Sequence, residues 1–328
     1  MSTILVTGGT GLTGANICEQ LIRRGDKVRT LVRDPQQAAE LSAIGVDLVQ
    51  GDIVNADDVL RAGEGCEAAI HTAALLGGAS QNIDDFLAVN VVGTINVLDA
   101  GESLGMRRVV ALSTSTFFDL SYPGHYEEAP LSAHPSEDPY TVTKLAAFRA
   151  VHERAAAGQD VLTCHPGAIF GPSQVVRRAL HPTSFNAVLR AAIRGRIPAY
   201  LKFPVWWVAV SDVASGSIAA LDRGVAGERY WLTGRPEDQI STAAGCNRAC
   251  EIAGVENRVE DLDYRSDPEQ LTKTFGPTLM AIAESAHSEV RTPRSVPNPT
   301  SERLGYAPIS LDQGLAMLVT WLREQEKI

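Results

Sequence analysis

Two groups of polar side chains in the first half of the chain have the types and the spacing that proton transfer requires. Tyr140 and Lys144 are four residues apart, so on a helix they share one face. Four hydroxyl residues stand together at 113–116, directly after an apolar run. A tyrosine beside an ammonium group can serve as an acid or a base, while a nearby hydroxyl holds the same substrate oxygen. These residues predict a site that moves a proton to or from a substrate oxygen.

The tyrosine needs help from its surroundings to act as a base. A phenol has a pKa near 10, and lowering that pKa by about three units is worth about 4 kcal/mol. Neighbouring positive charges supply such a shift, and the candidates are the Lys144 ammonium and the positive nicotinamide ring of a bound cofactor. The alternative is that Tyr140 packs at a helix start after Pro139 and that Lys144 is a solvated charge.

A glycine-rich turn lies at the beginning of the chain, between a predicted strand at 3–7 and a predicted helix that ends at Arg24. Its glycines, Gly8, Gly11 and Gly14, are spaced by three residues. This spacing allows a tight turn, close approach of a pyrophosphate to the backbone, and close packing of the helix on the strand. The turn therefore predicts a dinucleotide-binding site.

Strands and helices alternate after this turn. We predict further strands at 27–32, 47–49, 68–71, 108–112 and 161–165, and long helices at 82–104 and 140–157. Alternation of this kind produces parallel strands joined by crossover helices. The predicted fold is α/β, with a Rossmann-type doubly wound parallel sheet of about six strands, and the hydroxyl cluster lies at the carboxyl end of one strand.

The pattern changes after Gly171-Pro172. Helices are predicted at 184–194, 211–223 and 311–324, and short strands at 206–210 and 228–232. We therefore divide the chain into a nucleotide-binding domain, residues 1–172, and a smaller, mainly substrate-binding lobe, residues 173–328. Some segments of the lobe are expected to return to the core of the first domain.

The end of the second strand indicates which dinucleotide binds. A carboxylate there binds the ribose 2′-hydroxyl of NAD, whereas an arginine accepts the 2′-phosphate of NADP. When strand ends are aligned, Val32 takes the position of the acid and Arg33 follows it, which favours NADP(H) and leaves NAD(H) possible. Two alternatives stay open: Arg33 is a solvated residue paired with Asp34, or a one-residue shift brings Asp34 to the ribose.

Composition narrows the class of protein. The 328 residues carry a formal net charge of −10, which argues against a general binder of nucleic acid or of membrane surfaces. The first apolar run is too short for a signal peptide, and none of the runs is long enough to span a membrane. Five scattered cysteines indicate reduced thiols in a cytoplasmic protein, and no His/Cys grouping predicts a metal site.

The order of motifs along the chain resembles the extended short-chain dehydrogenase/reductases of the NAD(P)-dependent epimerase/dehydratase superfamily. The motifs are TGGTGLTG at 7–14, LVRDP at 31–35, GDI at 51–53, HTAA at 71–74, NVVGTINVL at 90–98, LSTS at 112–115, YTVTK at 140–144 and HPGAIFGP at 165–172. The resemblance covers nearly the whole chain. It is strongest for the dihydroflavonol-reductase and 3β-hydroxysteroid-dehydrogenase branch.

This resemblance implies roles for single residues. Tyr140 would be the acid/base, Lys144 its partner and a ribose ligand, and Thr114 or Ser115 the ligand of the substrate oxygen, with Thr114 preferred. Asn90 would support the site, and His71 is interpreted as structural. The implied cofactor contacts, besides Tyr140 and Lys144, are Gly8, Thr10, Gly11, Leu12, Gly14, Arg33, Asp52, Ile53, Ala73, Ala74, Pro166, Gly167 and Ile169.

Departures from the family pattern narrow the reaction. Dehydratases of this family place an Asp-Glu pair after the catalytic threonine, and this chain has Ser115-Thr116. Epimerases commonly carry an asparagine where this chain has Ala168. Seven aromatic residues are expected near the substrate and favour an apolar carbonyl or alcohol: Phe117, Phe118, Phe185, Tyr200, Phe203, Trp206 and Trp207.

The predicted function is that of an NADP(H)-dependent oxidoreductase with a small-molecule substrate. An NAD(P)-dependent sugar epimerase is the alternative, and a non-catalytic NADP-sensing regulator is a third reading. The long helices at 82–104 and 140–157 resemble the pair through which the family dimerises, so a homodimer is expected.

Overall fold

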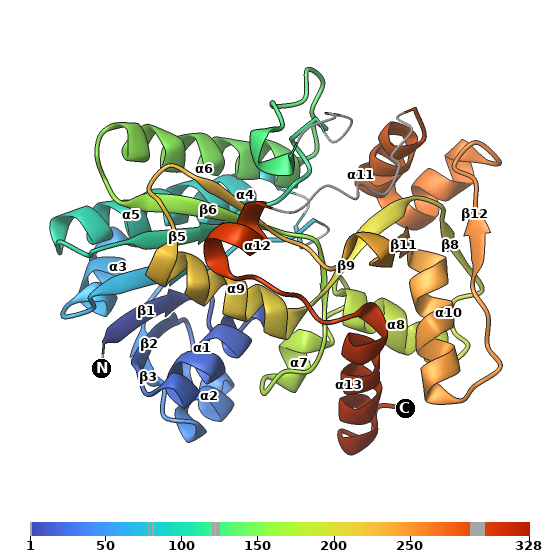
Figure 1. Ribbon diagram of the computed structural model, residues 1–328, viewed down its shortest axis with the longest axis horizontal. Coiled ribbons are helices and arrows are strands. Elements are labelled where there is room, and N and C mark those ends of the chain that lie inside the picture. The colour runs from blue at the N-terminus through green and yellow to red at the C-terminus, as the bar shows by residue number, and fades with distance from the viewer. Residues whose placement is uncertain (1, 78, 81, 120–121, 123–124, 289–298) are drawn as a thin grey trace.

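A parallel sheet forms the centre of the protein (Figure 1). The structure, a computed structural model, describes residues 2–328 apart from 78, 81, 120–121, 123–124 and 289–298. Within this part, seven strands lie in the order β3-β2-β1-β4-β5-β6-β10. They are β1 (Thr3–Thr7), β2 (Lys27–Val32), β3 (Asp47–Gln50), β4 (Ala68–His71), β5 (Val109–Leu112), β6 (Val161–Pro166) and β10 (Arg229–Leu232). All neighbouring pairs are parallel, so the predicted doubly wound sheet is confirmed.

The sheet has one strand more than the six predicted. The extra strand, β10, comes from the second half of the chain and pairs with β6, with Arg229 opposite Thr163. Three consecutive residues of β10, Tyr230, Trp231 and Leu232, are buried, as expected for a strand covered on both faces. The short run after residue 227 does not reveal which sheet the strand joins, because that choice depends on long-range pairing.

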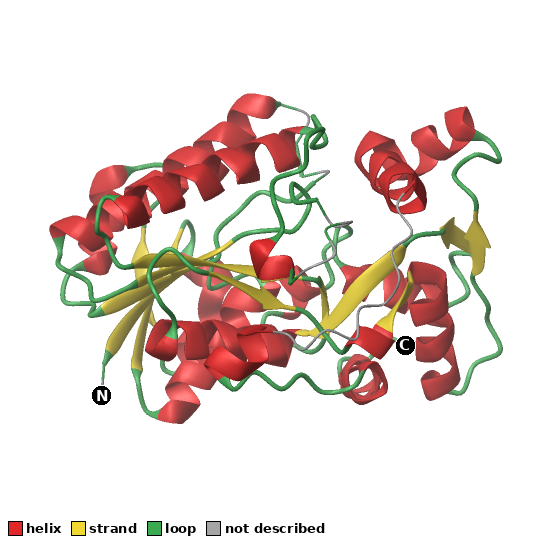
Figure 2. Cartoon of the chain, turned by 45° about the horizontal axis from the view of Figure 1, so that its top comes forward, coloured by secondary structure: helices red, strands yellow, loops and turns green. Residues whose placement is uncertain are grey.

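Helices cover both faces of the sheet, as Figure 2 shows. On one face, α1 (Leu12–Arg24) packs against α9 (Val210–Arg223), and α12 (Pro299–Leu304) packs against α9. On the other face lie α3 (Ala56–Gly63), α5 (Gly93–Ser103) and α6 (Pro139–Ala156). Ile4 and Val6 of β1 join one apolar core and Leu5 joins the other, since successive side chains of a strand point to opposite faces.

The long helix predicted at 82–104 contains an irregular turn. It consists of α4 (Ile83–Phe86), a π-helical segment (Leu87–Val92) and α5. Asn82 caps its beginning by accepting from the backbone N–H of Asp84. Three short elements complete the first domain: a 3₁₀ turn (Pro35–Ala38), α2 (Ala39–Ala43) and a 3₁₀ turn (Tyr126–Glu128).

The remaining strands of the described residues form two small sheets, mainly within the predicted substrate-binding lobe; β7 (Ala168–Phe170), which lies inside the predicted domain of residues 1–172, joins one of them. β9 (Pro204–Ala209) lies between β7 and β11 (Gln239–Ser241), and β8 (Ala199–Leu201) pairs with β12 (Glu260–Leu262). Around these strands lie α7 (Val176–Ala179), α8 (Phe185–Ile193), a 3₁₀ turn (Pro236–Asp238), α10 (Thr242–Ala253), α11 (Pro268–Ser288) and α13 (Leu311–Glu324). α13 begins and ends where predicted. Its start is fixed by a capping box that Ser310 and Gln313 form.

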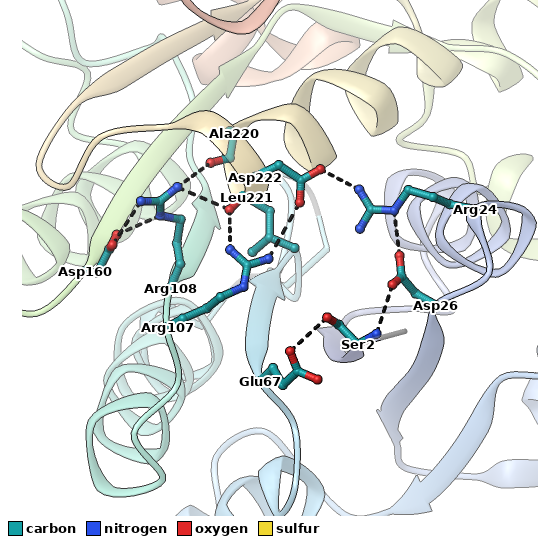
Figure 3. A network of polar contacts seen from close by, with 10 residues as sticks. All are labelled: Ser2, Arg24, Asp26, Glu67, Arg107, Arg108, Asp160, Ala220, Leu221 and Asp222. Carbon is teal, nitrogen blue, oxygen red and sulfur yellow. Dashed lines mark hydrogen bonds and ion pairs between the residues drawn. The ribbon is translucent and has the colours of Figure 1, made fainter.

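Hydrogen bonds and ion pairs of charged residues connect α9 to the amino end of the sheet (Figure 3). Arg107 and Arg108 precede β5 and donate to the Leu221 carbonyl at the end of α9, at 2.9 Å and 3.2 Å. Arg108 also forms a two-pronged ion pair with Asp160, at 2.7 Å and 2.9 Å. Asp222 accepts from Arg24 at 2.5 Å. Segments from distant parts of the chain therefore meet in one network of polar contacts.

Two further observations concern the class of protein. The five cysteines are free and buried. Among the described residues, no helix combines the length and the apolar character needed to cross a membrane.

Candidate active site

The three residues predicted to carry the chemistry come together at the carboxyl end of β5. Thr114 follows this strand, and Tyr140 and Lys144 lie one turn apart at the start of α6. The Thr114 side chain hydrogen-bonds to the Tyr140 phenol. The Lys144 ammonium donates to the Leu112 carbonyl at 2.7 Å. The geometry places Thr114, rather than the partly buried Ser115, beside the phenol.

The start of α6 explains the position of the tyrosine. Asp138 caps the helix by accepting from the backbone N–H groups of Tyr140 and Thr141, both at 3.1 Å. Pro139 is the first helical residue, where its missing N–H costs nothing. Tyr140 is therefore held in the first turn, with its phenol toward the end of β5.

Burial dominates the charge states of this pair. Burial raises the pKa of Tyr140, the hydrogen bond from Thr114 lowers it, and the negative charge of Asp138 raises it. Burial also lowers the pKa of Lys144 to about 8. Lys144, whose ammonium is hydrogen-bonded to the strand, is not among the groups that shift the Tyr140 pKa here, so the lowering expected from Lys144 together with a nicotinamide ring stays a prediction. Tyr140 is protonated at neutral pH, which is the state that can donate a proton.

His165 of β6 holds the backbone of Thr114. Its Nδ1 lies 2.8 Å from the Thr114 carbonyl and its Nε2 lies 2.9 Å from the Thr163 hydroxyl. A carbonyl only accepts, so Nδ1 carries the hydrogen, and burial keeps the ring neutral by lowering its pKa to about 3. Trp231 stacks on this ring at 5.7 Å. Our sequence interpretation missed His165, although it stands beside the Pro-Gly pair that was assigned to the cofactor.

Asn90 supports α6 from the π-helical segment. Its Nδ2 donates to the Thr143 hydroxyl at 3.1 Å and to the Leu75 carbonyl at 3.2 Å, and its Oδ1 accepts from the Leu75 N–H at 2.7 Å. Thr143 directly precedes Lys144, so the asparagine fixes the turn that carries the lysine. This contact agrees with the supporting role predicted for Asn90.

His71 is enclosed by hydroxyl groups, as a structural histidine would be. Its Nδ1 lies 2.7 Å from the Thr7 hydroxyl, and its Nε2 lies 2.9 Å from the Thr94 hydroxyl. Burial lowers the pKa of the ring to about 3, and the nearby Lys144 charge acts in the same direction. His71 is therefore neutral and satisfied.

A small cavity of about 10 Å³ lies behind the lysine. Its lining includes Ser113, Lys144 and Thr163. The Ser113 hydroxyl is buried and has no hydrogen-bond partner among the described residues. A space of this size has room for about one water molecule, which would satisfy that hydroxyl.

The turn between β1 and α1 has the shape that a pyrophosphate requires. Gly8 has φ +73°, and the Gly11 N–H donates to its carbonyl at 2.9 Å. A Cβ on Gly14 would lie 2.3 Å from that carbonyl, and one on Gly8 would lie 2.6 Å from the Ala73 nitrogen. No side chain caps the start of α1, so its N–H groups are left for an anion. The residues present fit a dinucleotide here.

The predicted cofactor residues lie at the carboxyl ends of neighbouring strands. Thr10 and Leu12 belong to the turn after β1, Asp52 and Ile53 follow β3, and Ala73 and Ala74 follow β4. Pro166 ends β6, and Gly167 and Ile169 lead into β7. All nine residues are partly exposed, so a bound molecule can reach them. Gly167 also has a packing role, because a Cβ there would lie 2.1 Å from the Trp206 carbonyl.

The side chains of Arg33 and Asp34 differ in the contacts that they make. Asp34 caps the following 3₁₀ turn by accepting from the Gln36 N–H at 3.0 Å and from the Gln37 side chain at 2.8 Å. The Arg33 guanidinium is exposed and makes no ion pair or hydrogen bond with the described residues. The structure therefore does not contain the Arg33–Asp34 ion pair that was one of the alternatives.

Comparison with known proteins shows the family to which the chain belongs. The model of the NAD dependent epimerase/dehydratase family matches residues 4–232. This chain belongs to that family.

Relatives and solved structures agree with this membership. Sterol demethylase protein B of Methylococcus capsulatus is 32% identical over 236 residues, which cover 71% of this chain and 70% of the relative. A 4-hydroxy-2-methyl-3-oxo-4-farnesyl-3,4-dihydroquinoline-1-oxide ketoreductase of Stigmatella aurantiaca is 29% identical and covers 80% of this chain and 76% of its own. The crystal structure of gox2253 superimposes over the full length of both chains with a TM-score of 0.84 and 25% identity.

The family places the chain among the extended short-chain dehydrogenase/reductases, enzymes that use NAD(P) on small molecules. The predicted resemblance, fold and enzyme class are thereby confirmed.

The aromatic residues predicted near the substrate divide into two groups. Phe117 and Phe118 are buried in a cluster with Phe148 and Trp231, and Trp207 is buried in the core of the second lobe. Phe203 belongs to the same lobe core, while Phe185, Tyr200 and Trp206 are partly exposed. Trp206 and Trp207 point to opposite sides of β9, as the alternation of a strand predicts, and the part of these aromatic residues in substrate binding stays a prediction.

Proposed function

We propose that this protein is an NADP(H)-dependent oxidoreductase that interconverts a carbonyl compound and an alcohol, with a fairly apolar substrate. The observation that carries the proposal is the protonated Tyr140 hydrogen-bonded to Thr114 beside the glycine turn. The similarity to a ketoreductase supports the same reaction class. The unpaired Arg33 at the end of β2 supports NADP(H) over NAD(H).

The residues suggest a division of labour in the direction of reduction. A bound nicotinamide supplies the hydride that the carbonyl carbon takes up. Thr114 and Tyr140 hold the carbonyl oxygen between their hydroxyl groups, and Tyr140 transfers its phenolic proton to that oxygen as the alcohol forms. Lys144 is charged below about pH 8, and in this proposal its charge stabilises the remaining phenolate together with the positive nicotinamide ring that hydride transfer would leave. His165 fixes the Thr114 backbone and moves no proton to the substrate.

Two departures from the family pattern speak against its other reactions. The hydroxyl residues Ser115 and Thr116 supply no carboxylates for dehydration. Ala168 replaces the asparagine that epimerases commonly direct at a sugar diphosphate, and it is buried in β7.

A substrate panel tests the proposal. The protein is incubated with NADPH and a set of apolar ketones and aldehydes, and the absorbance at 340 nm is followed. Loss of absorbance with one or more of them is the expected result. Turnover of a nucleotide sugar with no net change in cofactor would identify an epimerase instead, and NADPH binding without turnover of either class would identify a regulator.

A further inference from the structure

The short helix α7 belongs to the second half of the chain but contacts the nucleotide-binding domain. The Arg177 guanidinium donates to the Gln37 side chain at 2.5 Å, and Gln37 lies in the 3₁₀ turn that follows β2. Just before α7, the Gln174 side chain donates to Glu19 of α1 at 3.3 Å. Residues 174–178 therefore run from α1 to the end of β2, across the region predicted to hold the adenosine ribose.

This contact gathers positive charge at the end of β2. The charges that act on the Arg178 guanidinium are those of Arg177 and Arg33, and together with partial burial they lower the pKa of Arg178. Neither Arg33 nor Arg178 makes an ion pair with the described residues. In a chain with a net charge of −10, two arginines whose charges act on each other and that have no acidic partner among the described residues are unusual, since acidic residues are in excess.

We propose that Arg178 is a second guanidinium of the ribose 2′-phosphate site, added to Arg33 by the second half of the chain. A phosphate monoester carries close to two negative charges and accepts the planar fork of each arginine, which relieves the repulsion between them. Arg177 has a different part, because its hydrogen bond to Gln37 holds α7 in place. The inference rests on the proposed preference for NADP(H) and adds a residue from outside the predicted domain of residues 1–172.

The same arrangement connects cofactor binding to the substrate side. Val176 of α7 packs against the core of the second lobe together with Leu12 of the glycine turn. A phosphate held between Arg33 and Arg178 would therefore tie this lobe to the nucleotide-binding domain, and a cofactor without the phosphate would not.

Titration calorimetry with two small probes tests the role of Arg178. Adenosine 2′,5′-bisphosphate carries the 2′-phosphate and adenosine 5′-monophosphate lacks it. Arg178→Gln is expected to weaken binding of the bisphosphate about ten-fold, by loss of one charge-assisted contact at an exposed site, and to leave the monophosphate unchanged. Arg33→Gln should act in the same way. Arg196→Gln, at an exposed arginine after α8, is the matched control and should change neither affinity.

The outcomes separate this inference from the proposed cofactor preference. If the unaltered protein binds the two probes equally, the NADP(H) preference fails and Arg178 has no phosphate to bind. If the bisphosphate binds more tightly and Arg33→Gln removes that advantage while Arg178→Gln does not, the preference stands and the role of Arg178 is wrong. Thermal melts of each variant show whether its fold is kept.

Discussion

The two ends of the central sheet use polar residues in opposite ways. At the amino end, Arg107 and Arg108 donate hydrogen bonds to the Leu221 carbonyl. They also form ion pairs with Asp222 and Asp160, respectively. At the carboxyl end, Arg33 lies without an ion pair among the described residues, and the Ser113 hydroxyl has no partner there. The amino end joins segments of the chain. At the carboxyl end, the exposed Arg33 is open to molecules from solution, and the buried Ser113 hydroxyl borders a cavity with room for about one water molecule.

This difference has an energetic meaning. A buried polar group without a partner costs about 1–3 kcal/mol, so a fold keeps such groups only where something else satisfies them. Removing a charge at the amino end should therefore reduce stability, while removing one at the carboxyl end should reduce binding or turnover and leave stability nearly unchanged.

The largest effect is expected for Tyr140→Phe. Loss of the phenolic hydroxyl removes the proton donor, and carbonyl reduction should slow by roughly 1000-fold. NADPH affinity and the melting temperature should stay close to those of the unaltered protein, because the ring keeps its packing. Steady-state rates at 340 nm together with a binding titration check this. Turnover within ten-fold of the original would mean that another group supplies the proton.

A smaller effect is expected for Arg33→Asp. The carboxylate repels a 2′-phosphate and accepts from a ribose 2′-hydroxyl, so the ratio of NADPH to NADH affinity should fall by roughly 100-fold. Fluorescence titration of both cofactors measures the ratio. An unchanged ratio would show that Arg33 lies away from the phosphate, and Arg196→Asp serves as the control for the added negative charge.

At the opposite end of the sheet, Arg108→Ala should cost stability. The substitution leaves Asp160 without its two-pronged partner and removes one of the two donors to the Leu221 carbonyl, and the free energy of unfolding should drop by about 1–3 kcal/mol. Arg248→Ala breaks an exposed pair with Asp312 and should cost at most about 1 kcal/mol. Urea denaturation compares the two. Equal costs would contradict the distinction between the partly buried Arg108 contacts and the exposed Arg248–Asp312 pair.

The smallest effect is expected from pH. Lys144 is charged below its pKa of about 8 and neutral above it, so a rise in pH removes the charge that stabilises the Tyr140 phenolate. The reduction rate should halve near pH 8 and continue to fall at higher pH. In Lys144→Arg the group stays charged, and the decline should move above pH 10. A rate that is flat from pH 7 to 9.5 in the unaltered protein would exclude this role of the charge.

Local sequence signals predicted the parts of the protein that form within short stretches. The strand Thr3–Thr7, the glycine turn and α13 begin and end as expected, because caps and spacing are encoded where they act. The pair Tyr140 and Lys144 was found for the same reason, since four residues define one helical face.

Features that depend on contacts between distant segments were missed or only partly predicted. The strand β10 joins β6 across more than sixty residues, and no local pattern specifies that partner. His165 acts on Thr114, fifty-one positions away, and its strand setting looks like that of any buried residue. The charge of Arg33 acts on Arg178 because Arg177 of α7 holds this helix against the turn after β2.

The π-helical segment Leu87–Val92 determines how far α5 is rotated about the helix axis relative to α4. A turn of this kind contains about one residue more than a regular α-helical turn. It lets Asn90 face Leu75 and Thr143 while Val97 and Leu98 face the sheet. Deleting a single residue here would turn the flanking helices by about 100° relative to each other. The length of this segment, rather than any one of its side chains, therefore keeps the support of the lysine turn in register with the core.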